Sequence, residues 1–434
     1  MNFVEQVKNG LLDLIKEMSS VSWLFVKNPG TDFSRKRKLD FENTLWCLLS
    51  MESGDLKREL LELFGFRPEA PSASAFNQQR CKILPEAFEF LFHEFNNRFT
   101  DKKTYGGYSL IACDGSDLNI SRNPKDTDTY FQSLPNDRGF NQLHLNALYD
   151  LNNRRFIDAI VQAGKLENES LAMTQLVDRY TGDQKSIFIA DRNYETYNIF
   201  AHIEQKGMYY LIRVKDGTRG GMVSSFTLPD TDEFDHSISM ILTRKQTKAI
   251  KESPLPYKFI GKQSPFDYLD LDTNKFYSMT LRVVRFLIAE NTYECIVTNL
   301  PVTEFPVKKI KELYAMRWGI ETSFRELKYA VGLSCFHSKK AEFIQQEIYA
   351  RLILYNYSEL IITSIIISQN NTKHIYQINY TIAIHICRHF LRNDISPPNV
   401  EKLIQKHLLP VRPGRSAPRK VRPHSVVCFL YRVA

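Results

Sequence analysis

The sequence predicts an α/β protein whose core is a mixed sheet, with a β-rich insertion in that core and helical regions on both sides. Three observations carry this prediction. Apolar residues recur at three- and four-residue spacing over residues 1–100 and again from Phe305 onward, which is typical of amphipathic helices. Between these regions, short apolar strands alternate with helices from Tyr108 to Val214. Residues 215–300 lose the helical period and are rich in Thr, Ser, Pro and Asp, which favours extended structure.

The first hundred residues are predicted to be helical. Apolar spacing marks one helix around Leu11 and another around Leu45. Pro71 and Ser72 open a loop in which Ser72 is placed to cap the helix that follows. The aromatic-rich residues 86–99 form a further helix.

The segment from residue 108 to residue 214 has the element order of a mixed sheet. The predicted elements are a strand at 109–113, hairpin strands at 143–149 and 156–161, a helix capped by Asn168 or Ser170, a strand at 187–190, a helix at 197–205 and a strand at 209–214. In the insertion that follows, residues 277–288 are predicted to pair with residues 293–297 across a turn at Glu290 and Asn291.

These elements divide the chain into three regions. Residues 1–100 form a helical region, and residues 101–345 form the α/β core, interrupted by the insertion at 217–300. Residues 346–434 form a C-terminal helical region that ends in a basic tail.

Composition excludes several classes of protein. The chain has 434 residues, of which 43% are hydrophobic and 12% aromatic, so it is not intrinsically disordered. Its seven cysteines are scattered and never form a C-x-x-C pair, which excludes a disulfide scaffold and fits a reducing, cytoplasmic compartment. The most apolar stretch, residues 352–367, is shorter than the ~20 residues that span a bilayer, so no membrane partner is expected.

Positive charge is concentrated in two places. The run Arg35, Lys36, Arg37 and Lys38 lies near the N-terminus. The basic tail carries five of the eight excess positive charges, and its members are Arg412, Arg415, Arg419, Lys420 and Arg422. Such clusters bind phosphate backbones or are simply solvated surface, and both interpretations stay open for either cluster alone.

Two of the predicted strands end in an aspartate. Asp114 follows the strand at 109–113, and Asp191 follows the strand at 187–190. In open α/β sheets ligands bind beyond the carboxyl ends of the strands, so the two side chains are expected to face one crevice. Neighbouring carboxylates repel unless they share a proton or a cation, and their hard oxygens suit Mg²⁺ or Mn²⁺. For each aspartate alone, a turn or helix-capping role remains an alternative.

A predicted helix at 308–331 adds a third carboxylate. At ~100° per residue, one arc of roughly 80° collects polar side chains, namely Tyr314, Arg317, Glu321, Arg325 and Lys328. An apolar stripe lies directly beside it, made of Leu313, Ile320, Phe324, Leu327 and Val331. Ion pairs on a surface helix are the alternative, but they do not explain why the charged arc borders the buried stripe. Three carboxylates suffice for a two-metal phosphoryl-transfer site, in which Arg317, Arg325 and Lys328 grip phosphates.

The spacing Tyr314-x2-Arg317-x3-Glu321-x6-Lys328, within YAMRWGIETSFRELK, resembles the Tyr-Arg-Glu-Lys signature of DDE transposases of the insertion-sequence-four family. Asp114 in DGS and Asp191 in ADRNY match that family's first two acidic motifs. The resemblance extends to SRKRKLDF, to PSASAFNQQRCKILPEAF and to GLSCFHSKK, and so covers most of the chain. It implies a ribonuclease-H-like core with a β-rich insertion before Glu321.

The resemblance also implies roles for individual residues. Asp114, Asp191 and Glu321 would be the catalytic triad that holds two Mg²⁺ or Mn²⁺ ions. Tyr314, Arg317 and Lys328 would contact the DNA backbone at the element's ends, and residues 1–100 with their basic run would recognise the terminal inverted repeats. The implied protein acts on double-stranded DNA at the nucleoid as a homodimer on paired ends, which we expect to pair through the helical region after residue 342.

One departure from the family concerns tryptophan. Some relatives insert a Trp from the β-rich insertion to flip a base during hairpin formation, whereas Trp23, Trp46 and Trp318 all lie outside it here. A Phe or Tyr of the insertion is able to stack instead, so the hairpin route stays open. Trp318 either stacks on a displaced base or packs at the rim of the core.

Several other residues are not assigned to the site. Asp117 and Glu195 lie close to the two strand ends but are predicted to be turn or helix-start residues, and His144 is predicted to be a core or rim histidine. His385 and His389 stand four residues apart on a predicted helix, yet the sequence offers no third zinc ligand beyond Cys387, which points to another face. No G-x-x-x-x-G-K-[ST] loop is present, so ATP is not implied.

The sequence therefore predicts a cut-and-paste DNA transposase with metal-dependent hydrolysis at the element's ends and strand transfer into target DNA. Two alternatives remain: a metal-dependent nuclease of the same fold, and a catalytically silent DNA-binding repressor of the element.

Overall fold

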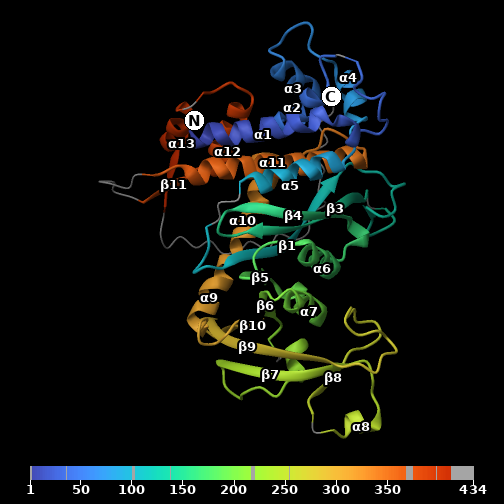
Figure 1. The fold of residues 1–434 in the computed structure, drawn as a ribbon, viewed down its shortest axis with the longest axis vertical. Coiled ribbons are helices and arrows are strands. Elements are labelled where there is room, and N and C mark those ends of the chain that lie inside the picture. The colour runs from blue at the N-terminus through green and yellow to red at the C-terminus, as the bar shows by residue number, and fades with distance from the viewer. Residues whose placement is uncertain are drawn as a thin grey trace.

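The computed structural model describes residues 2–35, 37–99, 103–136, 138–216, 220–253, 255–367, 375–396 and 398–411. A large sheet occupies the middle of the molecule (Figure 1). Helices from both ends of the chain pack together above it, and the strands of the insertion form its lower end in the same view.

In the described part of the chain, ten strands form this sheet. They are β1 (Ser109–Ile120), β2 (Tyr130–Phe131), β3 (Phe140–Asp150), β4 (Arg155–Ala163), β5 (Ser186–Ala190), β6 (Tyr209–Val214), β7 (Phe234–Thr243), β8 (Tyr257–Phe259), β9 (Tyr277–Ala289) and β10 (Thr292–Thr298). Their order is β2-β3-β1-β5-β6-β10-β9-β7-β8, and β4 lies beside β3.

The core of the sheet has the topology expected of a ribonuclease-H-like protein. β4, β3 and β1 are antiparallel neighbours, whereas β1, β5 and β6 run parallel. The antiparallel strands follow from the short turn between β3 and β4, because a few residues suffice to reverse the chain. Parallel strands need a longer crossover, and α6 (Glu169–Arg179) and α7 (Tyr197–Gln205) provide it. The predicted mixed sheet is therefore confirmed.

The two faces of the core sheet are covered by different helices. On one face, Ile111 and Phe188 pack in one hydrophobic cluster with side chains of α6 and α7. On the other face, Leu110 and Ile189 pack with side chains of α9 (Val307–Met316). α10 (Trp318–Glu326) continues along this second face, where its Ile320 shares a cluster with Ala112 of β1.

The insertion extends the same sheet. β10 pairs antiparallel with β6, and β9 pairs with β10 across a turn in which Asn291 adopts a φ of 52°. The hairpin predicted for this segment is confirmed. The insertion also contains the short helix α8 (Lys248–Lys251).

The helical regions at the two ends of the chain share one hydrophobic core. From the N-terminal region it includes α1 (Phe3–Ser20), α2 (Phe41–Ser50), α3 (Leu56–Leu63), α4 (Ala73–Arg80) and α5 (Glu86–Arg98), and from the C-terminal region α11 (Ala341–Ser364), α12 (Tyr380–Leu391) and α13 (Asn399–Lys406). Ser72 caps α4 as predicted, since its hydroxyl accepts a hydrogen bond from the Ala75 N–H at 3.2 Å. β11 (Tyr376–Ile378) and β12 (Leu408–Pro410) form a small separate ladder. Short 3₁₀ segments lie at Ser22–Leu24, Gly164–Leu166, Arg192–Tyr194 and Met222–Ser225.

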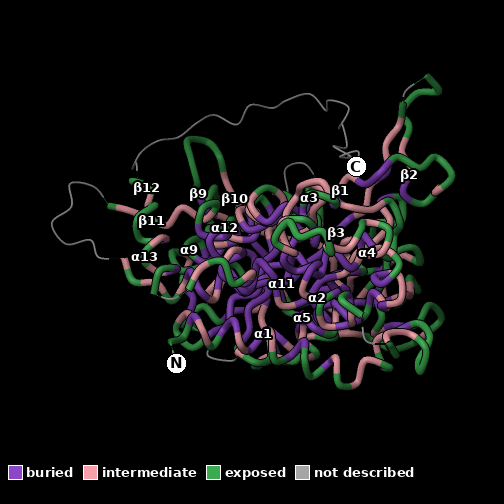
Figure 2. The backbone as a smooth tube through the Cα atoms, turned by 90° about the horizontal axis from the view of Figure 1, so that it is seen from above, coloured by how far each residue is buried: buried purple, intermediate pink, exposed green. Residues whose placement is uncertain are grey.

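α11 is the central helix of this region. It packs against α1, α2, α5 and α12, and most of its residues are buried, as the purple trace at its label shows (Figure 2). Most of residues 352–362 in the apolar stretch at 352–367 are buried inside the protein, whereas Ile366 near its end is exposed. None of the described helices combines the length and apolar character needed to cross a bilayer. The expectation that two copies pair through the helical region after residue 342 stays a prediction.

Candidate active site

Asp114 and Asp191 occupy equivalent positions on neighbouring parallel strands. Ala112 of β1 is paired with Ile189 of β5, and each aspartate lies two residues further along its strand's direction. Asp114 is still part of β1, where it pairs with Ala147 of β3, while Asp191 directly follows β5. The parallel register therefore brings the two carboxylates to the same level of the sheet.

The alternation of side chains directs both aspartates to the same face. Leu110 and Ala112 precede Asp114 at two-residue spacing on β1, and Ile187 and Ile189 precede Asp191 on β5. Leu110, Ile187 and Ile189 all pack in the cluster that includes α9. Since successive side chains of a strand point to opposite faces, Asp114 and Asp191 face the helices α9 and α10.

Glu321 lies on α10, which covers this face. The structure corrects the single helix predicted for residues 308–331: α9 ends at Met316, α10 begins at Trp318, and residues Leu327–Val331 form a π-helical turn. At the junction the Arg317 N–H donates to the Tyr314 carbonyl at 3.1 Å. This bond spans three residues, as in a 3₁₀ turn, where an α-helical bond would span four. The predicted apolar stripe is confirmed, because all five of its members are buried.

Arg317 links the third carboxylate to the first. Its Nη2 donates to Glu321 Oε1 at 2.6 Å, and its Nη1 lies 3.8 Å from Asp114 Oδ2. The guanidinium is nearly buried, so the attraction is weakly screened by water. Arg317 thus compensates one of the three carboxylate charges and holds Glu321 toward Asp114.

The acid–base chemistry of Asp114 reflects this crowding. Burial raises the pKa of its carboxyl to about 7, and the negative charges of Asp191 and Glu321 add to the increase. The Gly115 N–H, which donates to Asp114 Oδ1 at 2.9 Å, and the Arg317 charge oppose this increase in pKa. A carboxylate that is destabilised in this way gains from any further cation placed beside it.

The three carboxylates do not converge on a single point. Among the described residues, the groups of three potential ligands whose atoms all lie within 4.8 Å of one another are Glu52–His385–His389 and Asp117–His144–Glu167. The acidic triad is not one of these groups, so its oxygens are not gathered around a single point. In a two-ion site, Asp114, Asp191 and Glu321 would hold the ions together, and the three side chains would not all have to reach the same ion. The hard oxygen donors fit that use.

The other predicted contacts on this helix differ in exposure. Trp318 is 56% exposed, and the Arg317 guanidinium lies 5.4 Å from its ring centroid. Arg325 is exposed, whereas Tyr314 is buried at 4% exposure. Lys328 donates from Nζ to the Asp117 carbonyl at 2.7 Å, and burial lowers the pKa of its ammonium. Trp318 and Arg325 are thus accessible to a ligand in this structure, whereas Tyr314 is not.

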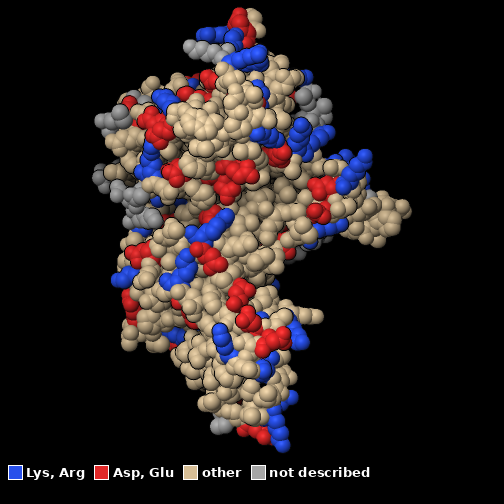
Figure 3. Space-filling view, turned by 45° about the vertical axis from the view of Figure 1, so that its right-hand side comes forward, with Lys and Arg blue, Asp and Glu red and all other residues tan. Residues whose placement is uncertain are grey.

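The predicted basic run lies far along the chain from this site, in the N-terminal region. Arg35 and Arg37 line a groove of about 280 Å³ together with Lys82. Lys38 donates to the Glu69 carbonyl at 3.0 Å. Lys36 and the basic tail after residue 411 lie outside the described residues. On the face drawn in Figure 3, Lys and Arg are interspersed with Asp and Glu.

A histidine cluster that the sequence analysis did not assign lies beside Asp114. His144 Nδ1 is 2.8 Å from Asp117 Oδ1 and 3.5 Å from Glu167 Oε2, and its Nε2 is 3.3 Å from Glu169 Oε1. These acids raise the pKa of His144 to about 9 against the effect of burial. Asp117 of β1 and His144 of β3 are directly opposite each other in the antiparallel ladder. A prediction of this strand register from the sequence would have placed the two side chains together. His144 is buried, as predicted. The prediction that Asp117 is a turn or helix-start residue was wrong, because Asp117 lies within β1 and its carboxylate pairs with His144 across the β1–β3 ladder.

Glu195 has a structural role at the base of the insertion. Its carboxylate accepts hydrogen bonds from the Lys215 N–H at 2.9 Å and from the Met222 N–H. Glu195 lies between the 3₁₀ turn Arg192–Tyr194 and the start of α7, which agrees with its prediction as a turn or helix-start residue.

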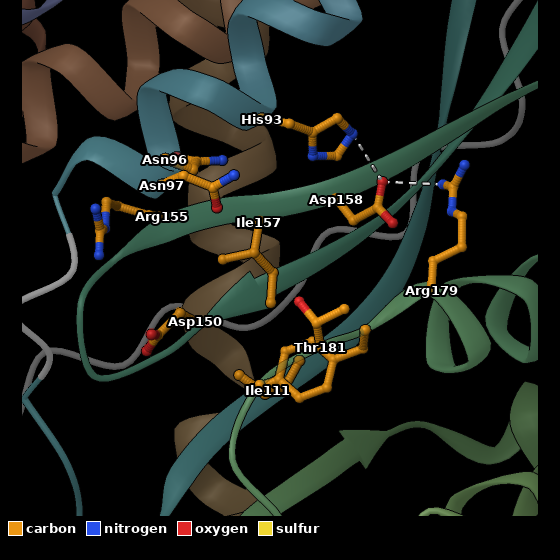
Figure 4. Close-up of a pocket in the computed structure, with 12 residues that line it drawn as sticks. His93, Asn96, Asn97, Ile111, Asp150, Arg155, Ile157, Asp158, Arg179 and Thr181 are labelled. Carbon is orange, nitrogen blue, oxygen red and sulfur yellow. Dashed lines mark hydrogen bonds and ion pairs between the residues drawn. The ribbon is translucent and has the colours of Figure 1, made fainter.

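A cavity of about 370 Å³ lies away from the triad (Figure 4). Ile111 lines it, and this side chain points to the face of β1 opposite to Asp114. Its charged groups pair with one another, since Asp158 lies 2.9 Å from Arg179 and 3.6 Å from His93. The cavity is therefore separate from the candidate active site.

Comparison with known proteins identifies relatives over this region. The family model described as Transposase DDE domain matches residues 105–357, more than half of the chain. The transposase InsG for insertion sequence element IS4 of Escherichia coli (strain K12) is 22% identical over 344 residues, which are 75% of this chain and 71% of that protein. The transposase for insertion sequence element IS231D of Bacillus thuringiensis subsp. finitimus is 26% identical over 236 residues, 47% of each chain.

For the relatives from Bacillus thuringiensis the match covers only part of their length. The transposase for insertion sequence element IS231E, also of Bacillus thuringiensis subsp. finitimus, is 23% identical, and the chain again spans about half (47%) of its length. Among solved structures, a piggyBac transposase synaptic complex with hairpin DNA is similar with a TM-score of 0.43 and 9% identity, covering 95% of this chain and 84% of that one.

Proposed function

The chain belongs to the DDE transposase family, and from that premise we propose that it cuts DNA at the ends of a mobile element and joins those ends to target DNA. One observation carries the proposal. Asp114 and Asp191 lie at the same register of neighbouring parallel strands, and Glu321 is tied to Asp114 through Arg317.

The proposed reaction consists of two phosphoryl transfers. In the first, a water oxygen attacks the phosphorus at the element's end, and the bond to the 3′-oxygen breaks to leave a 3′-hydroxyl and a 5′-phosphate. In the second, that 3′-hydroxyl attacks a phosphodiester of target DNA and releases a new 3′-hydroxyl there. Each step forms one P–O bond and breaks one, so no external energy source is needed.

Asp114, Asp191 and Glu321 are the residues proposed to hold two Mg²⁺ or Mn²⁺ ions. Such ions, when bound, stabilise the charge on the attacking and leaving oxygens. The chain itself directs the three carboxylates to one face of the sheet, partly buries Asp114 and supplies one compensating charge from Arg317. Arg317 leaves two of the three carboxylate charges uncompensated, so two divalent ions would exceed this negative charge, and the excess would face the phosphates of bound DNA.

DNA is the proposed partner, and the protein is proposed to act as a homodimer on paired ends at the nucleoid in the cytoplasm. Trp318 and Arg325 are exposed beside Glu321, where an aromatic ring and a guanidinium suit stacking on a base and bidentate binding of a phosphate. Lys328 and Tyr314 are also proposed to contact DNA. For this, Lys328 must leave the Asp117 carbonyl and Tyr314 must become exposed. Arg35 and Arg37 in their groove suit binding to the terminal repeats.

The variant Glu321→Gln tests the proposal. We expect it to bind end-bearing DNA like the wild type but to lose cleavage by at least 10³-fold, because an amide oxygen is a weaker ligand for a hard cation. Glu312→Gln is the matched control, since Glu312 is exposed on the neighbouring helix α9. Gel shift and nicking of supercoiled plasmid with Mg²⁺ measure the two properties. Nicking by Glu321→Gln at the wild-type rate contradicts the assignment.

The same plasmid assay separates the alternatives. A nuclease of this fold nicks DNA but does not join pre-cleaved ends to a target, whereas a transposase does both. A silent repressor binds the ends and produces no nick.

A further inference from the structure

A second cluster of metal-ligand side chains lies where the two ends of the chain meet. His385 and His389 are one turn apart on α12, with ring centroids separated by 4.6 Å. Glu52, just after α2, completes the cluster: one possible ligand atom from each of the three residues lies within 4.8 Å of the others. The sequence alone offered no third ligand for the histidine pair, because Glu52 is more than 300 residues away from it.

The side chains of this cluster are held in place by neighbours. Asp394 Oδ2 lies 2.9 Å from His389 Nδ1, and a proton on Nδ1 leaves the lone pair on Nε2 available. A carboxylate on the far nitrogen of a histidine is the usual support of a metal ligand. Arg392 Nη1 lies 3.3 Å from Glu52 Oε1, and its Nη2 donates to the Ser50 carbonyl at 2.6 Å. Glu52 is thereby turned toward His385, whose Nδ1 lies 4.0 Å away.

The cluster is open to solvent, so an ion from solution can reach it. His385 is exposed, and Glu52 and His389 are half-buried. Arg392 is the charge with which a bound ion would compete for Glu52. The group Asp117–His144–Glu167 differs, because His144 is buried and both of its ring nitrogens already face acids.

We propose that Glu52, His385 and His389 form a binding site for a divalent transition-metal ion of the Zn²⁺ class, separate from the site of the three acids. Two imidazoles and one carboxylate are a known ligand set for tetrahedral Zn²⁺ with water in the fourth position. Nitrogen ligands also favour Zn²⁺ or Co²⁺ over Mg²⁺. The bound ion would join α2 to α12 and so fasten the N-terminal helices to the C-terminal region.

The test uses the full-length protein without a histidine tag, stripped of metal and kept in excess Mg²⁺. Titration with Co²⁺, followed by visible absorption, and with Zn²⁺, followed by calorimetry, is expected to show one ion per chain. Zn²⁺ is also expected to raise the thermal unfolding temperature, because binding to the folded state alone stabilises it. Absence of stoichiometric binding by the wild type overturns the proposal.

Variants locate the site. His385→Ala, His389→Ala and Glu52→Gln are each expected to weaken Zn²⁺ binding at least tenfold, and Asp394→Asn about tenfold through the orientation of His389. His236→Ala is the control, since His236 is exposed on β7 in the insertion. Unfolding temperatures without metal show whether each variant folds, and Glu52→Gln keeps the test valid if a histidine variant does not. Equal Zn²⁺ affinity in wild type and folded variants also overturns the proposal.

Discussion

At the residue scale, the candidate active site depends on close contacts around Asp114. Arg317 occupies the space between Asp114 and Glu321, and Gly115 brings the β1 backbone against the His144 cluster. A side chain on residue 115 has no room, because an added Cβ lies 2.2 Å from His144 Nε2 and 2.6 Å from Glu169 Oε1. The glycine of the DGS motif is therefore required by packing.

Gly115→Ala is expected to lower the free energy of unfolding by about 1–3 kcal/mol, since the buried His144 must move. Urea denaturation measures the change. Gly261→Ala is the matched control, because its added Cβ meets nothing closer than Ser264 Oγ at 4.0 Å. Equal stability of Gly115→Ala and wild type would contradict the packing argument.

At the element scale, a helix terminus places Glu169, the acid that faces His144 Nε2. Glu169 is the first residue of α6, and the N-cap before it determines where that helix begins. The sequence left Asn168 and Ser170 as alternatives. The structure selects Asn168, whose side-chain oxygen accepts a hydrogen bond from the Leu171 N–H at 2.9 Å.

Asn168→Ala is expected to reduce the free energy of unfolding by about 1 kcal/mol through loss of this cap. Ser170→Ala, two residues later, is expected to change it by less than about 0.5 kcal/mol. Thermal unfolding of the two variants side by side measures the difference. If Ser170→Ala proves the more damaging change, the assignment of the cap is wrong.

At the scale of the whole molecule, a buried ionic network joins the N-terminal helices to α11. His337 follows the π-helical turn, and its ring lies between Glu59 of α3 at 3.4 Å and Glu347 of α11 at 3.2 Å. Arg80 of α4 reaches Glu347 at 2.9 Å, and Arg351 donates to the backbone carbonyls of residues 51 and 52. The two acids raise the pKa of His337 to about 9, and the pKa of each acid is lowered to about 2.

These shifts predict how stability depends on pH. A histidine with a raised pKa stabilises the fold fully below its ordinary pKa of 6.5, and this contribution is lost as the pH rises toward 9. The acids contribute above their ordinary pKa of 4.5, and their contribution is lost as the pH falls toward 2. The network is therefore expected to contribute most between pH 4.5 and 6.5.

His337→Gln is expected to reduce the free energy of unfolding by about 3 kcal/mol near pH 6, because it leaves two buried carboxylates with less compensation. The difference from wild type should shrink as the pH rises from 6.5 to 9. Urea denaturation across this range measures it, with His236→Gln as the control on an exposed histidine. A difference that does not change with pH contradicts the role of the imidazolium.

Local patterns predicted much of the fold because short-range rules decide those features. The strand before Asp114, the strand before Asp191 and the insertion hairpin follow from hydrophobic period and turn residues, and the structure contains all three. The helix at 308–331 was predicted as one piece, since periodicity does not register the tight turn at Arg317 or the π turn after Glu326. The sequence also did not predict which side chains of the polar arc are exposed. Tyr314 is buried because side chains of the sheet strands pack against it.

The sequence by itself determined the α/β class, the strand ends that carry Asp114 and Asp191, and the spacing that places Glu321 beside Arg317. Only the tertiary structure decided that the two chain ends share one core around α11, that Glu52 meets His385 and His389, and that His337 lies between two buried acids. The physical reason is range: periodicity and capping act within a few residues, whereas these contacts depend on how distant elements pack and leave no local pattern in the chain.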